Sequence, residues 1–183
     1  MRRPFVASAL APALAVTALS VAPVAARPVA PEDPHARTLE QARVVSVHDG
    51  DTITVRIGER NEKVRLVGID APELNDERAA YRDAGYAARD FARSLLSGKT
   101  VTLERDARQP DRDGYTRLLR YVILGDGTNV NEELVRRGYA RVYNRFDFGM
   151  KREFKEVETD AKRAGLGVWS LPPGPSREVP DER

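Results

Sequence analysis

Residues 49–73 read DGDTITVRIGERNEKVRLVGIDAPE, and this stretch decides how the rest of the chain is interpreted. Apolar and polar residues alternate along 53–57, and a second apolar run covers 64–69, with the turn-forming Gly-Glu-Arg-Asn before it. Alternation with a period of two predicts strands, so the stretch predicts a strand–turn–strand unit. Carboxylates stand at both of its ends, and Arg65 interrupts the second apolar run. Pairing of the two strands would bring these ends together.

The flanking sequence predicts the other elements of a small barrel. A strand is expected before the quoted stretch, at 45–47, and two more after it, at 101–103 and 119–123. Three helices are expected at 76–96, 131–138 and 148–164. Asn131 is expected to be the N-cap of the second helix. The whole pattern predicts an α+β domain that is mainly β: a five-stranded OB-fold barrel with three packed α-helices.

The two ends of the chain differ in composition from its middle. Residues 1–26 begin with Arg2-Arg3, continue with an almost uncharged apolar run and end with small residues, which predicts a signal peptide. Residues 27–42 are rich in proline and predict a flexible leader, and 172–183 predict a disordered tail. One domain is therefore expected over residues 43–171.

Overall charge excludes one class of nucleic-acid-binding protein. The chain has 30 basic and 28 acidic residues, and residues 1–26 contain two of the basic ones and none of the acidic. Removal of the signal would leave a balanced chain, which argues against binding through global charge. Basic residues do outnumber acidic ones over 136–163, a pattern interpreted as a solvated helical face rather than a dedicated DNA track. The absence of cysteine excludes disulfides, thiolate catalysis and cysteine zinc sites.

The acidic residues of the stretch suggest a site for a hard cation and a phosphodiester. Asp51, Asp70 and Glu73 offer oxygen ligands, which Ca²⁺ and Mg²⁺ prefer. A cation and two guanidinium groups, from Arg65 and Arg117, would stabilise the charge that develops on a phosphorus under attack by water. Glu73 is the nearest base for that water. The chain has only two histidines, which argues against a histidine-based mechanism.

One geometric condition must hold for this site to form. Arg65 and Asp70 have opposite parity, so in a regular strand their side chains would point to opposite faces. Both can reach one phosphate only if the strand bends between them, and Gly68 is the expected position of that bend. Regular extended geometry through Gly68 would exclude a shared site.

Several ordered motifs make the chain similar to the staphylococcal nuclease-like (thermonuclease) family over residues 43–170. The matching segments are Asp49-Gly-Asp-Thr52, Arg65-Leu-Val-Gly-Ile-Asp-Ala-Pro-Glu73, Asp113-Gly-Tyr-Thr-Arg-Leu-Leu-Arg-Tyr121, Val130-Asn-Glu-Glu-Leu-Val135 and Trp169-Ser170. The resemblance implies an OB-fold nuclease with one Ca²⁺ per domain that cleaves DNA and RNA and leaves 3′-phosphate products. It implies Asp51, Asp70 and the backbone carbonyl of Ala71 as metal ligands.

The same resemblance assigns roles around the phosphate. It implies that Glu73 orients or deprotonates the attacking water and that Arg65 and Arg117 hold the scissile phosphate. Tyr115 matches a tyrosine that contacts substrate phosphate. The chain departs from the family at Thr116, where a glycine usually precedes the second arginine, and this departure predicts a differently shaped turn.

The sequence thus predicts an exported Ca²⁺-dependent nuclease, extracellular or periplasmic. It would be a monomer that acts on DNA and RNA and engages no membrane after signal removal. One alternative is a non-catalytic OB-fold module that binds nucleic acid or protein, but such relatives lack some of the acids and arginines that are all present here. Another is a calcium-stabilised secreted structural domain, but this interpretation does not explain Arg65 and Arg117.

Overall fold

The computed structural model describes residues 39–172. The predicted signal peptide, most of the predicted leader and residues 173–183 of the predicted tail lie outside this range. The elements in chain order are β1 (Leu39–Val47), β2 (Thr52–Ile57), β3 (Arg60–Leu66), β4 (Ile69–Asp70), α1 (Ala79–Leu96), β5 (Thr100–Arg105), β6 (Leu118–Ile123), α2 (Val130–Arg136), β7 (Arg141–Val142), α3 (Lys151–Arg163) and the short 3₁₀ helix η1 (Gly167–Trp169).

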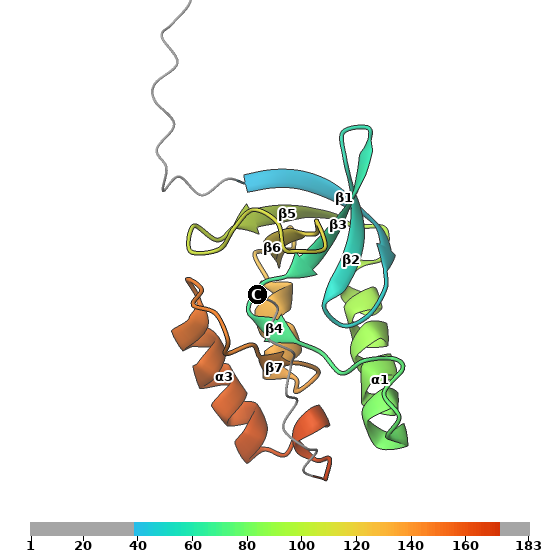
Figure 1. Cartoon of the computed structure of the whole chain (residues 1–183), viewed down its shortest axis with the longest axis vertical. Coiled ribbons are helices and arrows are strands. Elements are labelled where there is room, and N and C mark those ends of the chain that lie inside the picture. The colour runs from blue at the N-terminus through green and yellow to red at the C-terminus, as the bar shows by residue number, and fades with distance from the viewer. Residues whose placement is uncertain (1–38, 173–183) are drawn as a thin grey trace, which may run out of the picture. The chain divides into compact units, whose positions relative to one another are not determined.

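Five strands close into a barrel in the order β1-β2-β3-β6-β5, with β5 pairing back onto β1 (Figure 1). All neighbours are antiparallel except β3 and β6, which run parallel and pair Arg65 with Leu119. The strands turn one apolar face inward, and the buried core includes Val44, Ile53, Val55, Val64, Leu66, Val101, Leu103 and Val122. The predicted five-stranded barrel with three helices is confirmed.

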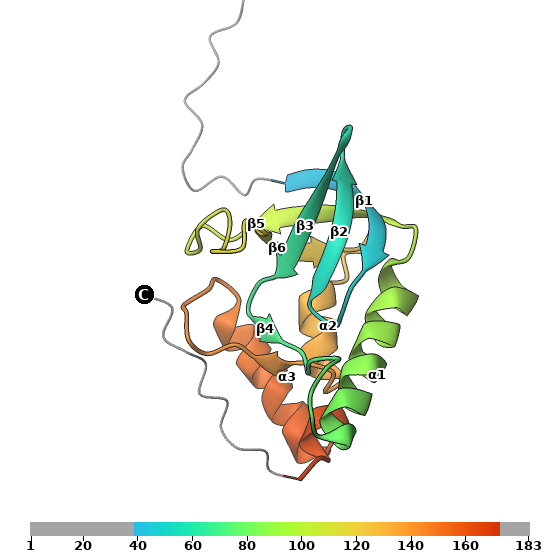
Figure 2. The same cartoon turned by 45° about the vertical axis from the view of Figure 1, so that its right-hand side comes forward.

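The helices and a second, smaller sheet lie beside the barrel. Strands β4 and β7 pair antiparallel and sit between α1 and α3 in both views (Figures 1 and 2). Helix α3 buries Phe154, Val157 and Ala161. No helix within residues 39–172 is long and apolar enough to cross a membrane.

Two predicted boundaries were wrong. Strand β1 begins at Leu39, so residues 39–42 belong to the barrel and not to a leader; they pair with β5 from Glu104 to Val101. The N-cap of α2 is Asn129, whose side chain accepts hydrogen bonds from the backbone N–H groups of Asn131 and Glu132. The start of β1 is decided by its pairing with β5, which is distant in sequence. The cap of α2 was ambiguous because Asn129 and Asn131 are only two residues apart.

Asn131 is instead a buried link between α2 and the barrel. Its Nδ2 donates to the carbonyl oxygens of Val67 at 2.9 Å and Arg120 at 3.2 Å, and its Oδ1 accepts from the N–H of Val122 at 3.0 Å. The side chain is fully buried. Since a buried amide is costly unless its hydrogen bonds are made, these three bonds fix the backbone just after β3 against β6.

The predicted bend at Gly68 is present. Gly68 has φ +80° and separates β3, which ends at Leu66, from β4, which begins at Ile69. A Cβ at this position would lie 2.6 Å from the ring of Phe148, so the glycine also permits close packing on that ring. Both the left-handed backbone and the contact therefore require glycine here.

Candidate active site

The break after β3 brings Arg65 between two carboxylates. Its Nη2 lies 3.1 Å from Oδ2 of Asp51 and 3.7 Å from Oδ1 of Asp70. Asp51 stands directly before β2, whose first residue Thr52 pairs with Arg65, and Asp70 is the last residue of β4. The two ends of the 49–73 stretch thus meet, as the condition on Gly68 required.

Asp51 is held as a buried carboxylate. Its Oδ2 accepts a hydrogen bond from the N–H of Ala71 at 2.8 Å, and its Oδ1 accepts one from the hydroxyl of Thr52 at 3.1 Å. Burial raises the pKa of this carboxyl; the Arg65 guanidinium opposes the rise, and the neighbouring Asp49 adds to it. A carboxylate whose charge is disfavoured by burial gains from any positive charge placed beside it.

The donors around Asp51 and Asp70 fit a hard divalent cation. Carboxylate oxygens of both residues face the same guanidinium nitrogen, and the Ala71 backbone that follows Asp70 is bonded to Asp51. Within residues 39–172 no three His, Cys, Asp or Glu side chains gather closely enough to hold a metal ion by themselves. A cation here would therefore need the Ala71 carbonyl and water to complete its oxygen shell, which is common for Ca²⁺.

Close backbone packing of α1 fixes the segment that carries these candidate ligands. A Cβ on Gly50 would lie 2.6 Å from the Cβ of Ala71 and 2.9 Å from that of Ala88 in α1. A Cβ on Gly85 would lie 2.7 Å from the carbonyl oxygen of Pro72. Gly85 therefore allows α1 to approach the backbone directly before the exposed Glu73.

Arg117 is positioned by its own turn, between β5 and β6. Its Nε donates to Oδ2 of Asp113 at 2.7 Å, and Oδ1 of Asp113 accepts from the backbone N–H groups of Tyr115 and Arg117. Thr116 has φ +64° and is the one non-glycine residue with positive φ among those described. Thr116 thus adopts the left-handed backbone that glycine adopts more easily.

The parallel pairing of β3 with β6 relates the two arginines. Arg65 lies opposite Leu119, and Arg117 is two residues before Leu119, directly ahead of β6. Residues two apart along a strand share a face, so this register favours Arg65 and Arg117 on the same side of the barrel. Tyr115 beside them is 65% exposed, with the Arg117 guanidinium 5.3 Å from its ring centre.

The sequence interpretation gave no role to Asp113, and it gave Asn131 only the role of a helix cap. Asp113 was visible only as part of a turn motif, and a carboxylate four residues before an arginine in a loop is not a distinctive signal. Its bonds to both the backbone and the side chain of Arg117 make it the residue that orients that arginine.

A family model described as staphylococcal nuclease homologue matches residues 63–171. The chain belongs to the staphylococcal nuclease homologue family. The matched range contains Arg65, Asp70, Ala71, Glu73, Tyr115 and Arg117, while Asp51 precedes it. The ion pair between Arg65 and Asp51 therefore joins the matched range to the segment directly before β2.

Relatives in this family include named nucleases. An uncharacterized endonuclease of Escherichia coli is 38% identical over 128 residues, which cover 70% of this chain and 76% of the relative. The thermonuclease of Staphylococcus intermedius is 35% identical over 132 residues, covering 71% and 76%. An uncharacterized protein of Methanocaldococcus jannaschii is 36% identical over 147 residues, covering 70% of each chain.

Proposed function

We propose that this chain is an exported Ca²⁺-dependent nuclease that hydrolyses phosphodiester bonds of DNA and RNA with little sequence specificity and leaves 3′-phosphate products. The observation that carries the proposal is the placement of Arg65 between Asp51 and Asp70 across the Gly68 break. Membership of a family with relatives named thermonuclease and endonuclease supports the same reaction class.

The proposed metal site consists of Asp51, Asp70 and the backbone carbonyl of Ala71. The oxygen donors suit one Ca²⁺ per domain, which would supply positive charge beside the scissile phosphate. The Thr52 hydroxyl and the Ala71 N–H hold the Asp51 carboxylate in a fixed orientation, so its charge is preorganised for this role.

The proposed chemistry is attack of water on phosphorus. Glu73, exposed and three residues beyond Asp70, takes a proton from the water as the new P–O bond forms. The bond from phosphorus to the 5′-oxygen breaks, and that oxygen takes a proton from solvent, which gives a 5′-hydroxyl and a 3′-phosphate. Arg65 and Arg117 donate hydrogen bonds to the phosphate oxygens as their charge grows, and Tyr115 contacts a substrate phosphate.

The decisive test uses the mature chain with single-stranded DNA and RNA, in Ca²⁺ and again with a chelator. Cleavage in Ca²⁺ that stops with chelator and falls by at least about 100-fold in Glu73→Ala supports the proposal. Exposed Glu77 provides a matched control, because Glu77→Ala removes the same group farther along the loop. Equal activity of wild type and Glu73→Ala would reject this site, and binding without any cleavage would favour a non-catalytic module.

Export and oligomeric state have separate tests. The signal predicted at residues 1–26 should direct the chain out of the cell, with mature protein in the medium or periplasm beginning near Arg27. Deletion of residues 2–26 should retain the protein inside the cell. Sedimentation of the mature chain should give a single species near the monomer mass.

A further inference from the structure

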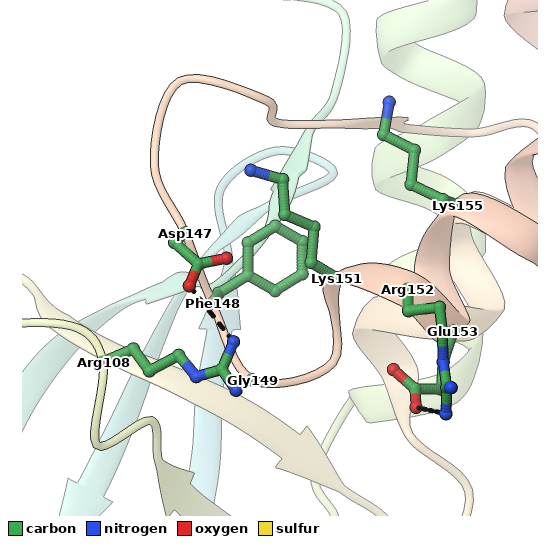
Figure 3. A pocket seen from close by; sticks show the side chains of 8 residues that line it. All are labelled: Arg108, Asp147, Phe148, Gly149, Lys151, Arg152, Glu153 and Lys155. Atoms are coloured by element: carbon green, nitrogen blue, oxygen red, sulfur yellow. Dashed lines mark hydrogen bonds and ion pairs between the residues drawn. The ribbon is translucent and has the colours of Figure 1, made fainter.

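A hollow of about 600 Å³ lies away from the proposed metal ligands, between the loop after β5 and the start of α3. Figure 3 shows Arg108 entering from one side and Lys151 and Lys155 from the helix on the other. Phe148 lies between them. Residues far apart in the sequence thus present three cations around one open depression.

The charges of this hollow favour an anion. Arg152 adds a fourth cation, and the carboxylates that line the hollow are Asp147 and Glu153. Arg152 pairs with Glu153 at 3.2 Å, and Lys155 pairs with Glu158 at 3.5 Å. Arg108 pairs with Asp147 at 3.1 Å, but both side chains are more than half exposed, and such pairs exchange partners at little cost. The Lys151 ammonium donates to the carbonyl oxygens of Phe146 at 2.9 Å and Asn144 at 3.5 Å, so its charge is held in place by dipoles rather than cancelled by a carboxylate.

One aromatic ring connects the hollow to the bend between Arg65 and Asp70. Phe148 lines the hollow, and its ring packs against Gly68, the residue that ends β3 and redirects the chain toward Asp70. The segment after β7 reinforces this link, because the N–H of Tyr143 donates to the Gly68 carbonyl oxygen at 2.9 Å. Residues that line the hollow are thus packed against the bend between Arg65 and Asp70.

We propose that this hollow binds a backbone phosphate of the nucleic acid a few nucleotides from the scissile one. The inference rests on the proposed function, since it needs a polyanionic substrate in the neighbouring site. Lysine and arginine commonly bind phosphate, and an open hollow suits a polymer that passes through rather than an enclosed small molecule. The basic residues of α3, expected from sequence to be a solvated face, thus acquire a role when Arg108 joins them.

The test is binding of a fluorescent single-stranded 30-mer DNA, followed by anisotropy in chelator so that no cleavage occurs, over a range of NaCl concentrations. The double variant Arg108→Gln/Lys151→Gln should bind roughly 5- to 20-fold more weakly at low salt. Its plot of log affinity against log salt should be shallower by about 0.7 for each phosphate that the variant no longer neutralises. The single variant Lys151→Gln should bind more weakly than wild type. Lys151→Arg retains the charge and should therefore keep most of the wild-type affinity.

The matched control is Arg137→Gln/Arg163→Gln, which removes two exposed, ion-paired arginines outside the hollow. It changes net charge equally, so a smaller effect on the salt slope in the control supports a local contact. Equal slopes for the two double variants, or a wild type that does not bind the 30-mer, would overturn the inference. Thermal melting of each variant identifies any loss of fold. If a double variant does not fold, the single variants Arg108→Gln and Arg163→Gln are compared in the same binding assay.

Cleavage separates this inference from the proposed function. In Ca²⁺ the ratio of kcat/KM on the 30-mer to kcat/KM on a dinucleotide should fall in Arg108→Gln/Lys151→Gln, because a dinucleotide is too short to reach the hollow. An unchanged ratio counts against the hollow while leaving the nuclease activity intact. Absence of cleavage in wild type, together with the predicted difference in salt slope, would reject the nuclease and retain the phosphate contact.

Discussion

Arg65 and Arg117 are proposed to hold the same phosphate, yet different kinds of structure position them. Arg65 belongs to β3, its side chain is 16% exposed, and the carboxylates beside it come from the segments before β2 and in β4. Arg117 precedes β6 in a loop and bonds to Asp113, four residues earlier in the same turn. The barrel fixes the first arginine, while a local turn fixes the second.

Because of this difference, substitutions at Arg65 and at Arg117 should have different effects on stability. The charge of Arg65 also compensates the buried Asp51, so Arg65 stabilises the fold in addition to its proposed role at the phosphate. The carboxylate of Asp113 accepts hydrogen bonds from the backbone N–H groups of Tyr115 and of residue 117, and both remain when the Arg117 side chain is removed. Substitutions at the two positions should therefore affect catalysis alike and unfolding differently.

The largest effect is expected from removal of either arginine. Arg65→Ala and Arg117→Ala should each lower kcat/KM by about 10³-fold, because each removes a donor to the charge that develops in the transition state. In chelator, Arg65→Ala should also lower the free energy of unfolding by about 3 kcal/mol, since it leaves Asp51 buried without its partner. Arg117→Ala should cost less than about 1 kcal/mol. Urea unfolding measures both, and equal stability losses would contradict the contrast.

Gly68→Ala tests the frame that holds Arg65 and Asp70. The new methyl group would meet the Phe148 ring on a backbone with positive φ, so we expect a loss of about 3 kcal/mol and a fall in kcat/KM of about 100-fold as Asp70 shifts. Gly58→Ala is the matched control, because Gly58 also has positive φ but nothing lies within 4 Å of an added Cβ. It should cost about 1 kcal/mol and leave kcat unchanged.

Asp113→Asn tests the turn that orients Arg117. The amide oxygen can still accept from the N–H groups of Tyr115 and Arg117, whereas the charged partner of the Arg117 side chain is lost. We expect a roughly tenfold fall in kcat/KM with near-normal stability, in line with loss of orientation. The exposed pair of Asp160 with Arg163 offers the control Asp160→Asn. Increased activity in Asp113→Asn would mean that the ion pair holds Arg117 away from the phosphate.

The smallest effect is expected at Thr116. Thr116→Gly removes the strain of a β-branched residue at φ +64°, partly offset by the greater freedom of glycine in the unfolded chain. The net gain in unfolding free energy should be about 0.5–1 kcal/mol, with kcat/KM within about twofold of wild type. Thermal and urea unfolding measure the gain. A large change in KM would show that threonine itself shapes the position of Arg117.

Local pattern was sufficient where the structure depends on neighbours in the sequence. Alternation predicted β2 and β3, and the parity conflict between Arg65 and Asp70 located the bend at Gly68 from the residues alone. The catalytic and metal-binding roles assigned to the site residues remain predictions that the experiments above must test.

Local pattern failed where distant partners decide. Residues 39–42 have a weak strand signal and become a strand because β5 pairs with them. In the sequence Asn131 resembles a helix cap, but in the folded chain its amide donates to the carbonyl groups of Val67 and Arg120. Likewise, nothing in the sequence places Arg108 opposite Lys151, because the loop after β5 and the start of α3 meet only in the folded chain.

The parallel pairing of β3 with β6 also determines when the site can exist. The segments that carry Arg65 and Arg117 are separated by α1 and β5, and such distant pairings form late and slowly because a long loop must close first. A chain that crosses a membrane unfolded would hold these arginines apart. If the protein is exported in that state, the order of folding events itself would protect the nucleic acids of the producing cell until the barrel closes outside.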